Sequence, residues 1–419
     1  MTTGPYYRDE RVTIHHADAL ALPLEDASVD LVVTSPPYFG LRSYQDGGEH
    51  YAGQIGSEAT PAEFVDALIA ATAEMVRVLK PSGSIWVNLG DKYDSSSKPG
   101  PTSSPLISAS GLDRRRESGA HGARRPVFGR PKSLMGIPWR YALRCIDDLG
   151  LILRAEVIWS KPNGLPESVT DRVRRSHETW FHFTVRPRYF SSVDEVREAH
   201  VYPNDTRHLR NAGTDYAKGA SGYINGAPNP LGKLPGSVWD IPTQPLRVPD
   251  HLGIDHFAAF PMEWPRRIIR GWSPAGVCVE CGEGRRPVSR SEQHLTQKTY
   301  NGRQATMVGR EDCRSVPPRV TVREIVGEEC ACPEPTAPTT PGVVLDPFGG
   351  TGTTALVAAS LDRHAVHVDL SADYCRLARW RVTDPGERAR ALEVPKPPEE
   401  PKGIDSLLDL LDDPERSRP

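Results

Sequence analysis

The chain has 419 residues, 38% of them hydrophobic, and a formal net charge of −3 at pH 7. No apolar run approaches the roughly 18 residues that a membrane span needs, which excludes an integral helical membrane protein. The charge excludes a uniformly basic surface, and the first residues show no apolar signal segment, so we expect a cytoplasmic protein. The length favours one large α/β domain with insertions, or two domains.

The first 92 residues show the pattern of an alternating α/β fold. Strands are predicted in "RVTIHHADAL", in the continuously apolar "VDLVVTSPP" and in "GSIWVNLGD". An amphipathic helix, "PAEFVDALIAATAEMVRVLK", begins near Thr60-Pro61 and is expected to end at Pro81-Ser82-Gly83. A strand, a helix and a strand in this order predict a parallel sheet.

Residues 93–133 interrupt this pattern and predict a mobile loop, because they are rich in Ser, Pro, Gly and Arg without periodicity. Residues 113–132 hold six arginines and a lysine, a local charge suited to phosphate contact. A helix and two strands follow within 134–190. Residues 191–240 are polar, rich in Gly, Asn and Pro, and have little apolar core.

The C-terminal part holds a complete strand–helix–strand–helix unit within residues 341–383. An ordered segment, "DHFAAFPMEWPRRIIRGWSP", precedes it, and a cysteine-rich insert separates the two. From about residue 384 the sequence is rich in Pro and Glu, so we expect a disordered tail, although "IDSLLDLLDD" has the pattern of a short amphipathic helix.

A glycine-rich turn, "LDPFGGTGTT", joins the first strand and helix of the C-terminal unit. Its glycines let a ligand approach the backbone and the helix N–H groups closely. A phosphate-binding loop would carry a lysine where Thr353 stands, and the dinucleotide pattern GxGxxG is absent. The turn is therefore either purely structural or built for a different ligand.

Two acids favour a different ligand. Asp346 precedes the glycines, where its charge would repel a pyrophosphate but suits a cationic amine. Asp369 ends the next strand, where an acid can hold ribose hydroxyls. A ligand with both an amine and a ribose indicates S-adenosylmethionine, with its amino-acid end over the glycine turn.

A second motif, "TSPPY", ends the apolar strand at residues 34–38, because proline lacks the N–H that a strand ladder needs. Together with "DPFGGTGTT" it resembles the DNA amino-methyltransferases, which transfer methyl from S-adenosylmethionine to cytosine N4 or adenine N6. The catalytic motif precedes the cofactor motif, which resembles the beta subgroup with its target-recognition region between them. The stretches "GLILRAEVIWSKPNGLPESVTDR" and "HVDLSADYCRLARWR" agree with this resemblance.

The resemblance implies an α/β, Rossmann-like S-adenosylmethionine-dependent methyltransferase fold, a mostly parallel doubly wound sheet with loop-rich insertions. It implies duplex DNA as the partner and leaves a cognate restriction endonuclease and the oligomeric state open. The implied catalytic residues are Ser35, Pro36, Pro37 and Tyr38. The expected cofactor-binding residues are Asp18, Phe260, Pro261, Asp346, Pro347, Phe348, Gly349, Gly350, Thr351, Gly352, Thr353 and Asp369.

The catalytic motif has a physical task in such an enzyme. An exocyclic base amine is a poor nucleophile because its lone pair is delocalised into the ring. The Ser35 hydroxyl and the Pro36 carbonyl can accept its N–H bonds from rigid positions, at no cost of reorganisation. Tyr38 offers a stacking face to a base flipped out of the duplex, and methyl transfer then proceeds by direct displacement.

Some departures and assignments stay open at this point. Gly350 and Thr351 stand where Ala or Ser is usual, and Asp369 stands where Glu is commoner. Asp18 resembles the acid that contacts the cofactor adenine, but it also suits an N-cap. Two further polar groups are candidates for the pocket or for DNA contact: Asn88 and Asp91 after one strand, and Lys161, Asn163 and Arg172 in a polar turn.

The insert carries Cys278-x₂-Cys281 and Cys330-x-Cys332, which predict a structural zinc knuckle. Free thiols are the alternative, and Cys313 is expected to be a spare cysteine. Zinc would hold together an insert whose 48 intervening residues are polar and show no evident core. Arg285, Arg286 and Arg290 nearby suit DNA contact.

The motifs also bear on the target base and on the alternative functions. Serine in the first motif position resembles the cytosine-N4 enzymes, with adenine-N6 as the alternative. A non-catalytic zinc-ribbon DNA-binding protein and an RNA or protein methyltransferase are more distant alternatives.

The expected segments are 1–92, catalytic half; 93–133, basic loop; 134–190, core; 191–240, target recognition; 241–277, cofactor-side core; 278–340, zinc insert; 341–383, cofactor βαβ; and 384–419, tail.

Overall fold

The computed structural model describes residues 4–40, 45–46, 49–50, 54–94, 130–200, 223–224, 227–229, 231–254, 259–295, 319–332 and 336–397. Most of the expected basic loop, part of the expected target-recognition region and the "IDSLLDLLDD" stretch lie outside these residues. No helix in the described part combines the length and apolar character that a membrane crossing requires.

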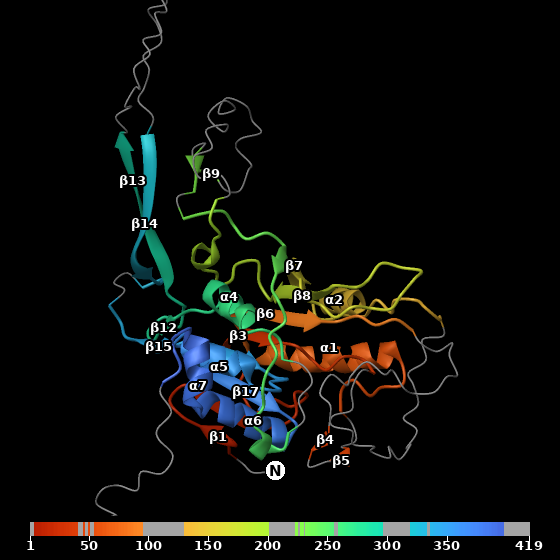
Figure 1. Cartoon of the computed structure of the whole chain (residues 1–419). Coiled ribbons are helices and arrows are strands. Elements are labelled where there is room, and N and C mark those ends of the chain that lie inside the picture. Colours follow the sequence, from red (N-terminus) through yellow and green to blue (C-terminus); the bar gives the residue numbers. More distant parts are fainter. Residues whose placement is uncertain are drawn as a thin grey trace, which may run out of the picture.

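A single mixed sheet organises the described core (Figure 1). Its strands, in spatial order, are β1 (Tyr7–Arg8), β2 (Val12–His16), β17 (His364–Asp369), β16 (Val343–Asp346), β3 (Val29–Thr34), β6 (Leu79–Leu89), β8 (His177–Thr184), β7 (Ile152–Ser160) and β11 (Val238–Asp240). The strands from β2 to β6 are all parallel, whereas β8 runs antiparallel to both of its neighbours. The mostly parallel α/β sheet expected from the sequence is thereby confirmed.

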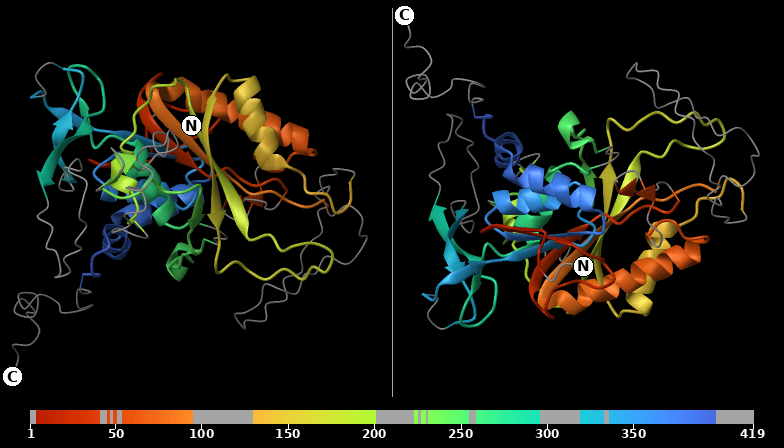
Figure 2. Two further views of the ribbon diagram at one scale, coloured as in Figure 1. Left: turned by 90° about the horizontal axis from the view of Figure 1, so that it is seen from above. Right: turned by 90° about the horizontal axis from the view of Figure 1, so that it is seen from below.

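Helices cover both faces of the sheet. They are α1 (Pro61–Val78), α2 (Ile137–Asp147), α4 (Glu263–Trp272), α5 (Thr353–Ser360), α6 (Ala372–Thr383) and α7 (Pro385–Leu392). Figure 2 shows α1 and α2 on one side of the strands and the blue helices α5 to α7 on the other. Each layer has its own hydrophobic core against the sheet, so β3 is buried along its whole length, as its continuous apolar run predicted.

Shorter elements lie outside the sheet. They are β4 (Gln45–Asp46), β5 (Glu49–His50), β9 (Tyr223–Ile224), β10 (Ala227–Pro228), β12 (Gly276–Cys278), β13 (Arg286–Leu295), β14 (Arg319–Glu329), β15 (Thr339–Pro341) and the 3₁₀ turns η1 (Val193–Val196) and η3 (Asp250–Leu252).

Helix α1 begins as predicted and ends early. Thr60 caps it, with Glu63 completing the reciprocal capping box and Pro61 opening the first turn. The helix ends at Val78 rather than at Pro81-Ser82-Gly83. A proline disfavours helical backbone at the residue before it, so Lys80 cannot easily stay in the helix. Instead Leu79 already pairs with Val29 of the neighbouring strand.

The insert between the cysteine pairs contains a hairpin that the sequence pattern did not predict. β13 and β14 pair antiparallel, from Arg286↔Glu329 to Leu295↔Arg319, with a bulge at Val288/Ser289. The hairpin projects away from the helices and the sheet (Figure 1). Its pairing is local and its strands are rich in charged residues, and the apolar side chains of Ile325 and Val326 are exposed rather than buried on one face.

The expectation of a disordered tail from residue 384 is wrong for its first part, where α7 forms. Asp384 caps this helix by accepting from the Glu387 N–H at 2.8 Å, and Pro385 occupies the first turn. Glu387 is buried and receives the Arg381 Nε–H at 2.9 Å. This carboxylate neutralises a buried guanidinium and so attaches the helix to α6, an interaction that composition does not reveal.

Candidate active site

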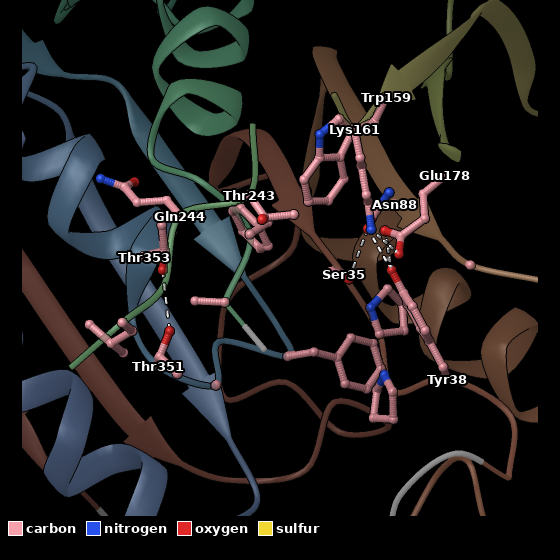
Figure 3. A pocket seen from close by; sticks show the side chains of 18 of the residues that line it. Ser35, Tyr38, Asn88, Trp159, Lys161, Glu178, Thr243, Gln244, Thr351 and Thr353 are labelled. Carbon is pink, nitrogen blue, oxygen red and sulfur yellow. Dashed lines mark hydrogen bonds and ion pairs between the residues drawn. The ribbon is translucent and has the colours of Figure 1, made fainter. Parts of the chain in front are cut away.

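A cavity of about 890 Å³ lies where β2, β17, β16, β3 and β6 end (Figure 3). The carboxyl ends of parallel strands are the usual place for a ligand in such a fold. Its walls include these residues expected from the sequence: Asp18, Ser35, Pro36, Pro37, Tyr38, Phe260, Pro347, Phe348, Gly349, Gly350, Thr351, Thr353 and Asp369. Both motifs, about 310 residues apart along the chain, therefore face one space.

Three of the expected cofactor residues lie behind the wall. Gly352 caps α5 in a left-handed conformation with a φ of 77°. Pro261 is buried next to Phe260, whose ring packs edge-on against Trp180 with centroids 5.8 Å apart. Asp346 lies under the glycine turn.

The glycine turn needs its glycines. Gly350 has a φ of +49°, in the left-handed region that disfavours larger residues. A Cβ atom on Gly349 would lie 2.1 Å from Nδ1 of His367, in the strand beneath. The turn therefore lies directly on the sheet, and its backbone forms one side of the cavity.

Asp346 supports this turn from below. Its side chain is 1% exposed and accepts the hydroxyls of Thr34 and Thr354, each at 2.7 Å. The Phe348 N–H also donates to it, at 3.2 Å. Burial raises the pKa of this carboxyl to about 6. The structure does not place the carboxylate on the cavity wall, so the expectation that it meets the cofactor amine directly is not met.

The other two acids that the sequence predicted as cofactor-binding residues do reach the cavity wall. Asp369 accepts backbone N–H groups of Gly350 and Ser371, both at 2.8 Å, and remains partly exposed. Asp18 follows the adjacent strand and lines the same cavity. One of its oxygens accepts the Leu20 N–H at 2.9 Å, so the turn-capping role left open by the sequence is also present.

Arg381 of α6 holds the glycine turn from behind, a role that the sequence did not suggest. It is 2% exposed, and its guanidinium donates to the hydroxyls of Thr351 at 3.2 Å and Thr353 at 2.8 Å. Both threonines reach the cavity wall (Figure 3). Together with Glu387, Arg381 links α7 to the glycine-turn side of the cavity.

The opposite side of the cavity carries the Ser35-Pro36-Pro37-Tyr38 motif. Ser35 Oγ lies 3.3 Å and the Tyr38 hydroxyl 2.8 Å from the same acceptor, Oδ1 of Asn88. Asn88 is fixed in turn by donating to the Thr179 carbonyl at 3.2 Å. A Cβ on Gly90 would lie 2.5 Å from the Tyr38 ring, so a glycine is needed where that ring crosses the strand end.

Other polar residues have mainly local roles. Asp91 also lines the cavity and accepts the N–H groups of Gly136 and Ile137, which caps the start of α2. Asn163 exchanges hydrogen bonds with the Thr243 backbone, and Arg172 pairs with Glu167.

Lys161 does not stand on the outside of its polar turn but reaches into the cavity. It forms an ion pair with Glu178 and lies over the Trp159 ring, with Nζ 4.1 Å from the ring centroid. Glu178 also accepts the Tyr38 hydroxyl at 2.7 Å. Sequence reasoning missed Glu178 because β8 is antiparallel, so that its beginning meets the ends of the parallel strands.

The four cysteines of the insert come together as predicted. The Sγ atoms of Cys278, Cys281, Cys330 and Cys332 all lie within 4.8 Å of one another. Cys278 and Cys332 have their sulfurs 3.7 Å apart. Four sulfurs around zinc at about 2.3 Å would be separated by about 3.8 Å, so the cluster fits that ion. Backbone N–H groups of Cys281 and Glu280 lower the pKa of the Cys278 thiol, whereas hydrogen bonds with the neighbouring cysteines raise the pKa of the Cys332 thiol.

Comparison with known proteins identifies relatives. A family model described as "DNA methylase" matches residues 29–279 and 328–379. The type II methyltransferase M.XycI of Xanthomonas campestris pv. cyanopsidis is 37% identical over 269 residues, 64% of this chain and 74% of that protein. M.SmaI of Serratia marcescens, also a type II methyltransferase, is 28% identical over 375 residues, 90% of this chain and 91% of its own length.

One solved structure shares the overall fold. The PvuII DNA methyltransferase (cytosine-N4-specific) superposes with a TM-score of 0.51 at 18% identity. The match covers 94% of this chain and 96% of the other.

Proposed function

The chain belongs to the DNA methylase family of S-adenosylmethionine-dependent enzymes that methylate cytosine N4 or adenine N6, and we propose that its target is cytosine N4 in duplex DNA. The observation that carries this proposal is the placement of Ser35 and Tyr38 in one cavity with the glycine turn. Such a cavity can hold a methyl donor and an extruded base at the same time.

The catalytic motif prepares the amine. The Ser35 hydroxyl and the Pro36 carbonyl accept the two N–H bonds of the base amine, which draws its nitrogen toward a pyramidal, nucleophilic form. The ring of Tyr38 stacks on the flipped base, and its hydroxyl is held by Asn88 and Glu178. These groups are in place before the base enters, so their effect needs no rearrangement during reaction.

The other side of the cavity fits S-adenosylmethionine. The backbone of Phe348, Gly349 and Gly350 receives its amino-acid end, and Asp369 accepts its ribose hydroxyls. Asp18 and Phe260 border the remainder of that site. Bound S-adenosylmethionine would supply an activated methyl group on its sulfonium. The amine nitrogen takes it by direct displacement, S-adenosylhomocysteine leaves with the electron pair of the S–C bond, and the methylated amine releases one proton to solvent.

We assign cytosine rather than adenine as the target on the basis of Ser35. Serine in the first position of the motif resembles the cytosine-N4 enzymes, whereas Asp or Asn is more frequent in the adenine-N6 enzymes. Adenine-N6 methylation is the second candidate, because the same acceptors suit its amine equally well.

Two further assignments complete the proposal. The cluster of Cys278, Cys281, Cys330 and Cys332 holds a structural zinc ion, which fixes the base of the β13–β14 hairpin to the core. Residues 191–240 and the basic loop at 93–133 are assigned to contact with the duplex around the target base. The partner in a modification system would be a restriction endonuclease that recognises the same DNA sequence.

Mass spectrometry of nucleosides tests the proposed function. Genomic DNA from a methylation-deficient host is incubated with the protein and S-adenosylmethionine, then digested. We expect N4-methylcytosine. N6-methyladenine would refute the cytosine assignment while keeping the enzyme class. Unmodified DNA, with the donor shown to bind, would refute DNA as the substrate.

A further inference from the structure

The base side of the cavity contains a lysine that the methyl-transfer chemistry does not use. Lys161 directly follows β7, and its side chain is 19% exposed. Figure 3 shows the chain running past Trp159, with the ammonium directed at the group formed by Asn88, Glu178 and the Tyr38 hydroxyl. This end of the lysine therefore lies beside the atoms that hold the target amine.

The surroundings of Lys161 fix its position. Its ammonium pairs with Glu178, whose side chain is 17% exposed and also holds the Tyr38 hydroxyl at 2.7 Å. Trp159 supports it through a cation–π contact, with Nζ 4.1 Å from the ring centroid. A lysine held by both an ion pair and a ring has lost much of its side-chain freedom and presents its remaining N–H donors in a defined direction.

Fold stability does not explain this pair well. Removing an ammonium and a carboxylate from water costs about as much as their attraction returns, so a buried pair is weak evidence for a stabilising role. Asn88 would still hold the Tyr38 hydroxyl without it. A charged donor retained in the wall of a binding cavity points instead to a ligand that needs it.

The two candidate bases differ at one place within reach of such a donor. Both offer an amine to Ser35 and Pro36, and in both the next ring atom is a nitrogen acceptor. Beyond that nitrogen, cytosine has a carbonyl oxygen, O2, whereas adenine has a C–H group. A donor facing this position is satisfied by cytosine and left unpaired by adenine, and an unpaired buried donor is costly.

We propose that the Lys161 ammonium donates a hydrogen bond to O2 of the extruded cytosine and so selects cytosine over adenine. Glu178 is its positioning residue, because it holds the ammonium while orienting Tyr38. The inference rests on the proposed cytosine-N4 activity and adds the residue that sets the base.

The test compares two bases in the same protein sample. Duplexes carry the target site of the protein with cytosine or adenine at the methylated position, each opposite an abasic residue so that extrusion costs little. The ratio of kcat/KM for the two bases does not depend on the fraction of folded enzyme. For Lys161→Met, we expect a ratio of kcat/KM for cytosine over adenine about 10-fold to 100-fold lower, from a loss at cytosine and no loss at adenine, where the unpaired donor is removed.

Lys80→Met is the matched control. Lys80 has similar exposure, 22%, and also pairs with a carboxylate, that of Asp30, but at the opposite end of β6. The ratio of kcat/KM for cytosine and adenine in Lys80→Met should equal that of the wild type. An equal loss at both bases in Lys161→Met would overturn the inference and leave Lys161 a structural residue. A wild type that methylates adenine alone would instead refute the proposed function itself.

Discussion

Ser35 and Tyr38 share one acceptor, Asn88 Oδ1, on the side of the cavity opposite the glycine turn, and the proposed function gives the two sides different tasks. In the Ser35→Ala variant the base amine loses one of its two acceptors. We expect methyl transfer to fall by about 100-fold to 1,000-fold, the usual loss for one preorganised hydrogen-bonding group. The affinity for S-adenosylhomocysteine, measured by calorimetry, should stay within about twofold because Ser35 lies across the cavity from the glycine turn.

Ser360→Ala is the control, since its hydroxyl bonds to Val357 within the last turn of α5. It should behave as the wild type in both measurements. A Ser35→Ala variant that loses donor affinity as strongly as rate would contradict the division of the cavity into two sides.

Asp346 gives a pH-dependent prediction. Burial raises the pKa of this carboxyl from 3.8 to about 6, so the folded protein holds its proton more tightly than the unfolded chain does. Its contribution to stability is therefore present at low pH and lost as the pH rises through this range. Urea unfolding from pH 4 to pH 7 should show Asp346→Asn gaining stability relative to the wild type. A difference that does not change with pH would contradict this assignment.

At the scale of the element, α7 acts on the cofactor side of the cavity through α6. Glu387 neutralises Arg381, which holds Thr351 and Thr353 in the turn. We expect Glu387→Gln to lower the free energy of unfolding by about 3 kcal/mol, because one charge of a buried pair is left uncompensated. The affinity for S-adenosylhomocysteine should fall by about 10-fold as well, although Glu387 lies outside the cavity wall.

The exposed Arg388→Ala on the same helix controls for general damage to α7 and should leave both quantities unchanged. Calorimetry with S-adenosylhomocysteine gives the affinity, and urea unfolding gives the stability. If Glu387→Gln lost stability but kept its full affinity for S-adenosylhomocysteine, α7 would only stabilise the fold.

The sequence predicted those elements whose signal is local or periodic. The apolar run of β3, the Thr60-Pro61 start of α1 and the turn between β16 and α5 all appear where expected. Glu178 was missed because its position depends on an antiparallel neighbour in the sheet, which leaves no pattern in the nearby residues. Helix α7 does have a local start signal, Asp384-Pro385, but the Pro- and Glu-rich composition of the segment was taken as evidence of disorder.

At the scale of the whole molecule, the cysteine cluster joins the hairpin to the core. Metal analysis of the purified protein should find about one zinc ion per chain. Cys330→Ser should lose this zinc and become sensitive to proteolysis between residues 278 and 340, while donor binding by the core persists. Because the ligands lie at both ends of the insert, losing one frees the hairpin rather than the sheet.

Cys313→Ser is the matched control and should retain zinc. Its structure lies outside the described residues, but it was expected from the sequence to be a spare cysteine. Zinc-free wild-type protein with an equally resistant hairpin would contradict the structural role of the metal.

The proposed function requires one cavity to hold the methyl donor and an extruded cytosine together. A crystal structure with S-adenosylhomocysteine and a duplex containing the target site would show both ligands at once. We predict S-adenosylhomocysteine over Gly349 and Gly350, and the cytosine stacked on Tyr38 with its amine at Ser35 and Pro36. A base that remains in the duplex, or S-adenosylhomocysteine bound away from the glycine turn, would rule this arrangement out.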